Sequence, residues 1–91
     1  MLTLDAALRI PDYVMSTTDN EDIVLLNART DQYYALDEVG ARLWSLLKDS
    51  KPLREIYQTL LDEYEVVPVQ LEQDILELLN HLLENGLVES V

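Results

Sequence analysis

The chain has 91 residues, 48% of them hydrophobic, which is enough for one domain with a core of its own but not for two. It contains no cysteine, which excludes a disulfide scaffold, thiolate metal sites and a cysteine nucleophile. Eighteen acidic residues against six basic ones give a formal net charge of −12, which disfavours nucleic acid and anionic membrane surfaces as partners. The acidity is also compatible with a role in solubility alone.

The first twelve residues are predicted to form an arm that ends at Ile10-Pro11-Asp12 and is either partly mobile or laid across the domain. The folded domain is expected to span residues 13–91. No basic segment followed by a long apolar run is present, so we predict neither a secretory signal nor a membrane span. These features favour a cytoplasmic protein, and the absence of cysteine agrees with that compartment.

Three short strands are predicted in the first third of the chain. Tyr13–Thr17 has the composition of a strand, and Ile23–Asn27 is a continuous apolar run that we expect to meet little solvent on either face. A polar turn over residues 18–22 joins these two segments. After the connection Ala28–Asp31, Gln32–Leu36 is the return strand. The three segments together predict a small antiparallel sheet.

Three helices are predicted to follow the strands. Asp37 is a good N-cap for the first helix, and Asp49-Ser50-Lys51 interrupts its pattern. Pro52 and Pro68 each suit the first turn of a following helix. The third helix is expected to end at about Asn85, because a glycine follows that favours a left-handed stop. Strands followed by helices predict an α+β domain, in which the second and third helices resemble a helix-turn-helix pair.

Residues that carry catalysis are scarce. The only histidine, His81, is expected to lie on the surface near the end of a helix. Gly40 and Gly86 are the only glycines, so no glycine-rich loop can cradle a phosphate. The carboxylates mostly fall on helix faces that we expect to be solvated: Glu55, Asp62, Glu63, Glu72, Glu77 and Glu84. We therefore expect no enzymatic activity, no metal and no cofactor.

The predicted third helix has a broad apolar face. At 100° per residue its leucines and Ile75 cover an arc of roughly 160°, whereas packing on one core needs about 100°. Either part of this face remains free, or the helix is central and packed on both sides. Asp74 lies at the rim of the arc, where it meets either water or the polar groups of a bound segment.

The segment Gln32–Leu36 is informative because an outer strand of a small sheet leaves backbone N–H and C=O groups unpaired. Natural edges are usually protected by lysine, proline or bulges, and this segment has no lysine or proline. An unprotected edge beside an apolar helix face is what β-strand addition of a peptide requires. Tyr33 and Tyr34 add little to this argument, because tyrosines in strands more often pack in a core or across strands.

Several motifs in order resemble the PqqD-like proteins, the recognition elements for precursors of ribosomally made, modified peptides (RiPPs). The family pattern "LLN…YYALNEVGARIW" is matched by Val24–Asn27 and Tyr33–Trp44, with Asp37 in place of an asparagine. Leu61 with Tyr64-Glu65-Val66 matches the next helix of the family. Its final helix is matched by Asp74-Ile75, Leu79, Leu82 and Gly86-Leu87-Val88. The resemblance covers roughly residues 13–88.

The resemblance implies a winged helix-turn-helix-like fold of three strands and three helices. It also implies that a leader peptide adds as a further strand beside the third strand, in the cleft against the third helix. The implied peptide-binding residues are Val24, Leu26, Tyr33, Tyr34, Ala35, Leu36, Leu71, Asp74, Ile75 and Leu78. Which side of the helix faces the peptide stays open.

The motif wording is most similar to the stand-alone members that act in lasso peptide biosynthesis, which implies a separate leader peptidase as partner. The alternative within the family is a protein that presents a precursor to a radical-SAM enzyme. From a different class, a winged-helix transcriptional regulator suits the shape, but its recognition helix would contain Glu72, Asp74, Glu77 and Glu84 and no lysine or arginine. A structural subunit that uses the same apolar face for a permanent partner also stays open.

Overall fold

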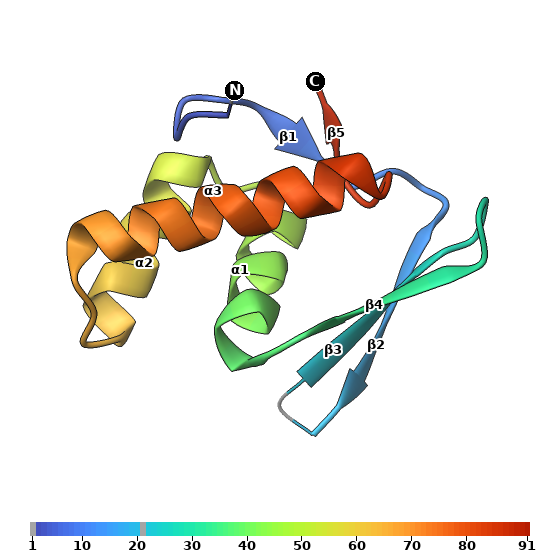
Figure 1. Cartoon of the computed structure of the whole chain (residues 1–91), viewed down its shortest axis with the longest axis horizontal. Coiled ribbons are helices and arrows are strands. Elements are labelled where there is room, and N and C mark those ends of the chain that lie inside the picture. Colours follow the sequence, from blue (N-terminus) through green and yellow to red (C-terminus); the bar gives the residue numbers. More distant parts are fainter. Residues whose placement is uncertain (1, 21) are drawn as a thin grey trace.

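A computed structural model describes residues 2–20 and 22–91 of the chain. Figure 1 shows the helices gathered on one side of the molecule, with the larger sheet extending from them. The α+β class expected from the sequence is confirmed. In chain order, the elements of the described residues are β1 (Leu8–Arg9), β2 (Val14–Asp19), β3 (Asp22–Asn27), β4 (Gln32–Leu36), α1 (Glu38–Lys48), α2 (Leu53–Glu63), α3 (Pro68–Glu84) and β5 (Glu89–Ser90).

The larger sheet is antiparallel, with the strand order β2-β3-β4. Its β2–β3 turn is shorter than the polar turn expected over residues 18–22, because Thr18 pairs with Ile23 and Asp19 with Asp22. Asn20 sits in the turn at φ 59°, a left-handed conformation that asparagine tolerates. Glu21, which the expected turn includes, lies outside the described residues. Among the described strands, β4 pairs only with β3 and is therefore an outer strand.

A second, two-stranded sheet of β1 and β5 was not expected from the sequence. Leu8 pairs with Ser90 and Arg9 with Glu89, and the Val91 amide donates a hydrogen bond of 3.0 Å to the Ala7 carbonyl. Arg9 and Glu89 also form an ion pair across the two strands. Residues 7–9 of the arm are therefore laid along the C-terminal segment, and Figure 1 shows β1 beside β5.

The helix ends follow from the local sequence. The Asp37 carboxylate accepts a hydrogen bond of 2.9 Å from the Gly40 amide, which confirms Asp37 as the N-cap of α1. Pro52 immediately precedes α2, and Pro68 is the first residue of α3. Gly86 follows the end of α3 at φ 68°, the left-handed conformation expected for the stop.

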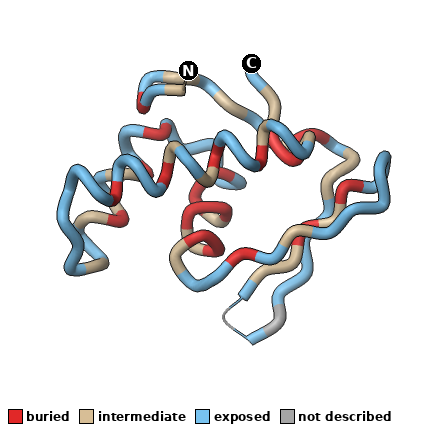
Figure 2. Tube along the Cα trace, viewed as in Figure 1, coloured by how far each residue is buried: buried red, intermediate tan, exposed pale blue. Residues whose placement is uncertain are grey.

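The core lies among the three helices and continues to the larger sheet through α1, which contacts β3 and β4. Figure 2 shows buried stretches in all three helices. From α3, a stripe of four side chains enters the core: Leu71, Ile75, Leu79 and Leu82. Leu76 and Leu78 flank this stripe on either side and are half-buried. The broad apolar arc of α3 is thus divided into a buried centre and two half-exposed flanks.

One buried polar side chain ties the sheet to the end of α3. Asn27 is 3% exposed, and its Nδ2 donates a hydrogen bond of 2.9 Å to the Asn85 carbonyl. Its Oδ1 accepts a hydrogen bond of 3.0 Å from the Arg29 amide. Buried amides are costly without partners, so these bonds fix how β3 and α3 pack together.

Among the described residues, no helix combines the length and apolar character that crossing a bilayer requires.

Candidate functional site

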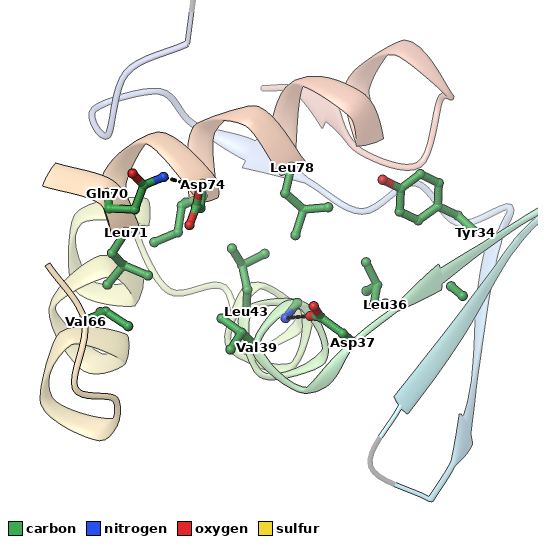
Figure 3. A pocket seen from close by; sticks show the side chains of 13 residues that line it. Tyr34, Leu36, Asp37, Val39, Leu43, Val66, Gln70, Leu71, Asp74 and Leu78 are labelled. Atoms are coloured by element: carbon green, nitrogen blue, oxygen red, sulfur yellow. Dashed lines mark hydrogen bonds between the residues drawn. The ribbon is translucent and has the colours of Figure 1, made fainter. Parts of the chain in front are cut away.

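A groove of about 510 Å³ lies between β4, the first turns of α1, and α3. We call it the β4–α3 groove. Its volume is within the range of about 300–1,000 Å³ that is usual for ligand sites. Figure 3 shows side chains from the three elements pointing towards one another across it. The lining residues are Tyr34, Ala35, Leu36, Asp37, Val39, Gly40, Leu43, Val66, Gln70, Leu71, Asp74, Ile75 and Leu78.

The floor of the β4–α3 groove is apolar and is part of the core. Leu43 is 1% exposed and Ile75 2%, and Leu36 and Leu71 are also buried. Val39 and Leu78 are half-buried and form the upper walls. Because close-packed core side chains hold the floor, it presents a fixed apolar surface that can receive a bound side chain.

The charged side chains that line the groove are both acidic. Asp37 is committed to capping α1. Asp74 is exposed at the rim, and its Oδ1 accepts a hydrogen bond of 2.8 Å from Gln70 Nε2, drawn in Figure 3. No lysine or arginine is among the lining residues of this groove. The rim therefore favours a ligand that brings hydrogen-bond donors or positive charge.

The backbone of β4 adds a second kind of binding capacity. Among the described residues, the backbone of Tyr33–Leu36 makes no backbone hydrogen bond outside the β3–β4 pairing. In a strand that pairs on one side only, N–H and C=O groups point outwards along the other edge. Since Tyr34, Ala35 and Leu36 line the groove, an extended segment can pair with the edge of β4 while its side chains enter the groove.

The groove brings together seven of the ten residues implied by the sequence motifs: Tyr34, Ala35, Leu36, Leu71, Asp74, Ile75 and Leu78. It does not include Val24, Leu26 or Tyr33. Leu25 pairs with Tyr34 on the inner face of the sheet, so their neighbours Leu26 and Tyr33, which also pair, lie on the outer face. Tyr33 is 72% exposed there.

Six lining residues were not expected from the sequence: Asp37, Val39, Gly40, Leu43, Val66 and Gln70. Val39 and Leu43 belong to the apolar stripe of α1, and such a stripe looks the same whether it faces a core or a groove. Gly40 allows a close approach, because a Cβ atom there would meet Asp37 Oδ1 at 3.3 Å and Leu36 Cβ at 3.4 Å. Val66 and Gln70 carry no periodic signal that separates them from a solvated loop and helix start.

Groups suited to catalysis do not gather in the groove. Within the described residues, no cluster of histidine and acidic side chains could hold a metal ion. His81 is exposed in the last turn of α3 and does not line the groove. The resolved pKa shifts lie elsewhere: hydrogen bonds from Arg42 lower the pKa of Glu63, and burial raises the pKa of the Tyr64 hydroxyl. What the groove offers is an apolar floor, an acidic rim and a strand edge.

Known proteins are similar to this chain both in sequence and in fold. Residues 22–88 match the family described as coenzyme PQQ synthesis protein D (PqqD). A solved structure described as TbiB1 in complex with the TbiA(beta) leader peptide is 37% identical, with a TM-score of 0.85 over 89% of this chain and 94% of the other. A lasso peptide synthetase B1 complexed with the leader peptide is 30% identical, with a TM-score of 0.83 over 92% of this chain and 99% of the other. No curated protein matches the chain.

Proposed function

The chain belongs to the PqqD family, and on that premise we propose that it captures the leader segment of a ribosomally made precursor peptide and presents it to a separate processing enzyme. The observation that carries this proposal is the β4–α3 groove, in which an outer strand, an apolar floor and an acidic rim lie together. The two similar structures, at 37% and 30% identity, are both complexes with leader peptides.

The proposed binding mode is β-strand addition. The leader lies extended beside β4, and its backbone pairs with the outward N–H and C=O groups of this strand. Alternate side chains of the leader then point into the groove, where Leu43, Ile75 and Leu78 receive an apolar side chain. Main-chain pairing supplies affinity that depends little on sequence, and the apolar floor selects the register.

Asp74 supplies the polar part of recognition in this proposal. It is exposed at the rim and already oriented by Gln70, so it can accept a hydrogen bond from a leader N–H or a cationic side chain without rearranging. Val24, Leu26 and Tyr33 have a different role in the proposal: they support β4 from the outer face and do not enter the groove.

The protein acts as a tether and not as an enzyme. Holding the leader keeps the rest of the precursor close to the active site of a partner, at an effective concentration of the order of millimolar for a short flexible connection. We assign the pathway as lasso peptide biosynthesis, because one of the two similar structures is a lasso peptide synthetase B1. The resemblance to the stand-alone members of that pathway implies the leader peptidase as the partner. The alternative is a radical-SAM enzyme, as the family description of coenzyme PQQ synthesis suggests.

The fold is proposed to be a variant of the winged helix-turn-helix, with residues 13–91 as the recognition domain and residues 1–12 as its arm. That shape also suits a transcriptional regulator. The charge argues against this function, because the chain has a net charge of −12 and α3, which would enter the DNA groove, has no lysine or arginine. Peptide binding is therefore the function that the site supports better.

The test is a calorimetric titration of the chain with the leader peptide of the precursor encoded beside its gene. A scrambled peptide of the same composition serves as the control, because it keeps charge and hydrophobicity but loses register. We expect saturable binding of the native leader and at least roughly tenfold weaker binding of the scrambled one, a difference of about 1.4 kcal/mol. Absence of heat at tens of micromolar leader would rule out the proposed function.

A further inference from the structure

We propose that a second groove, lined by basic side chains, binds an acidic segment of a partner protein that also carries apolar side chains. This groove lies between β1 with the arm before it, the end of α1 and the start of α2, and it measures about 680 Å³. It shares no lining residue with the β4–α3 groove. We call it the basic groove. The proposal does not depend on leader binding.

The charge of the basic groove is opposite to that of the chain as a whole. The chain has six lysines and arginines, and three of them, Arg9, Lys48 and Lys51, line this one groove. Asp5 is the only acidic side chain in the lining. In a protein of net charge −12, this gathering of positive charge gives an acidic partner a local surface of opposite charge.

Two of these cations are available to a partner. Asp5 is engaged by Arg54, at 3.0 Å between Arg54 Nη2 and Asp5 Oδ1, and Arg9 pairs with Glu89. Lys51 reaches only 3.9 Å from Glu55 Oε1, in a pair that is about half exposed on both sides. Among the described residues, Lys48 has no ion pair. The ammonium groups of Lys48 and Lys51 can therefore bind a carboxylate, because they give up little ion-pair energy within the chain when they do so.

The rest of the lining is largely apolar. This favours an acidic protein segment over a small anion or a nucleic acid. Leu47 and Leu53 are buried below the groove, and the arm contributes Ala6, Leu8 and Ile10. A small anion would gain nothing from this surface, whereas a leucine of a protein segment would bury apolar area there. A nucleic acid would be repelled by the acidic remainder of the chain, while a short segment stays within about 8 Å of the groove's own charges.

Both grooves can be filled at once. Helix α1 contributes Val39, Gly40 and Leu43 to the β4–α3 groove, and its other end contributes Leu47 and Lys48 to the basic groove. Figure 1 shows β1, which borders the basic groove, and β4 on opposite sides of α3. A partner held at the basic groove therefore leaves the edge of β4 free for a peptide.

The experiment measures fluorescence anisotropy of a labelled octapeptide of alternating glutamate and leucine with blocked ends, added to the whole chain. Two matched peptides replace the glutamates by lysine or the leucines by serine. We expect saturable binding of the glutamate–leucine peptide that weakens as salt is raised, and binding of each matched peptide weaker by roughly tenfold or more. Equal binding of the serine peptide would overturn the apolar part of the proposal, and equal binding of the lysine peptide the acidic part.

Variants locate the site. The double change Lys48→Glu with Lys51→Glu should weaken binding by roughly tenfold, whereas Lys48→Arg with Lys51→Arg should retain it. Arg29→Glu reverses an exposed charge outside the basic groove and serves as the control. Undiminished binding by the glutamate double variant would contradict the proposal, as would loss of binding in Leu78→Glu, which would place the peptide in the β4–α3 groove. Leader binding should be unchanged in the lysine variants, so the two functions can fail separately.

Discussion

Gln70 donates a 2.8 Å hydrogen bond to Asp74 one turn further along α3, at the rim of the β4–α3 groove. The bond comes from a residue of the same helix, so the chain itself holds the carboxylate at the rim of the groove. Pre-orientation of this kind lowers the entropic cost of ordering the side chain on binding. Both side chains are exposed, so their contribution belongs to recognition more than to folding.

Replacing Asp74 tests this recognition role. Asp74→Ala should weaken leader binding by about 1.5–3 kcal/mol, the usual range for a charge-assisted hydrogen bond, and should leave the midpoint of thermal unfolding nearly unchanged. Calorimetric titration and a thermal melt measure the two effects. Glu72→Ala removes an exposed acid from the same helix outside the groove, and it should have no effect on affinity. Equal losses in both variants would show that net charge, not Asp74, is responsible.

A second prediction concerns the packing of the sheet on α3. Asn27→Ala removes the hydrogen bond to the Asn85 carbonyl and leaves that group without its partner, so we expect a loss of about 1–3 kcal/mol in the free energy of unfolding. Trp44, the single tryptophan and 1% exposed, provides the fluorescence signal for denaturation. Asn80→Ala changes an exposed asparagine on α3 and should cost far less. Equal stability of the two variants would contradict the role given to Asn27.

The glycine after α3 should be equally sensitive. Gly86 has φ 68°, and a Cβ atom there would lie 3.0 Å from Asn27 Nδ2. Gly86→Ala is expected to lower the free energy of unfolding by about 1–2 kcal/mol from the left-handed backbone, with an added loss from displacing Asn27. Because both changes disturb the same contact, the double variant with Asn27→Ala should lose less than the sum of the single losses. Strict additivity would show that the two residues act independently.

The ion pair between Arg42 and Glu63 predicts a pH dependence of stability. Two nitrogens of Arg42 bond the Glu63 carboxylate, the shorter at 2.8 Å, and this lowers the pKa of Glu63 from its ordinary value of 4.5. A lowered pKa in the folded state means that the stabilisation is present above pH 4.5 and is lost as the pH falls through the lowered value. Glu63→Gln should therefore be slightly less stable at neutral pH, with the difference disappearing in acid.

Denaturation at a series of pH values measures this difference. The effect should be small because the pair is exposed, and it should shrink as salt is added. Asp62→Asn removes the neighbouring exposed charge, which has no ion pair among the described residues, and it supplies the control. A Glu63→Gln deficit that persists unchanged at low pH would indicate lost packing and not a lost ion pair.

Local sequence was sufficient for most of the fold. Strand-type composition, an apolar run and turn residues identified the strands, and Asp37 and Gly86 marked helix ends by chemistry that acts within a few residues. The β1–β5 sheet was not predictable in this way. It consists of two residues from each end of the chain, and only tertiary packing brings Arg9 and Glu89 together.

The sequence predicted only part of the site. The physical reason for each difference depends on the element concerned. The family resemblance implied Val24 and Leu26 as contacts, but Leu25 shares the inner face with Tyr34, so its two neighbours lie on the outer face. The α1 residues were missed because a stripe that includes Leu43 serves the core and the groove at once. How deeply a side chain is buried and which side chains surround it decide whether it faces the core, the groove or the outer side of the sheet. Both depend on how the whole chain packs.

The most direct test of peptide binding in the β4–α3 groove compares two changes on the same helix. Leu78 and Leu76 are both half-buried leucines of α3, but only Leu78 lines the groove. Titrated calorimetrically with the leader peptide, Leu78→Glu should bind at least roughly tenfold more weakly than the unchanged chain, while Leu76→Glu should bind as it does. Undiminished binding by Leu78→Glu in a chain that still unfolds cooperatively would contradict the account.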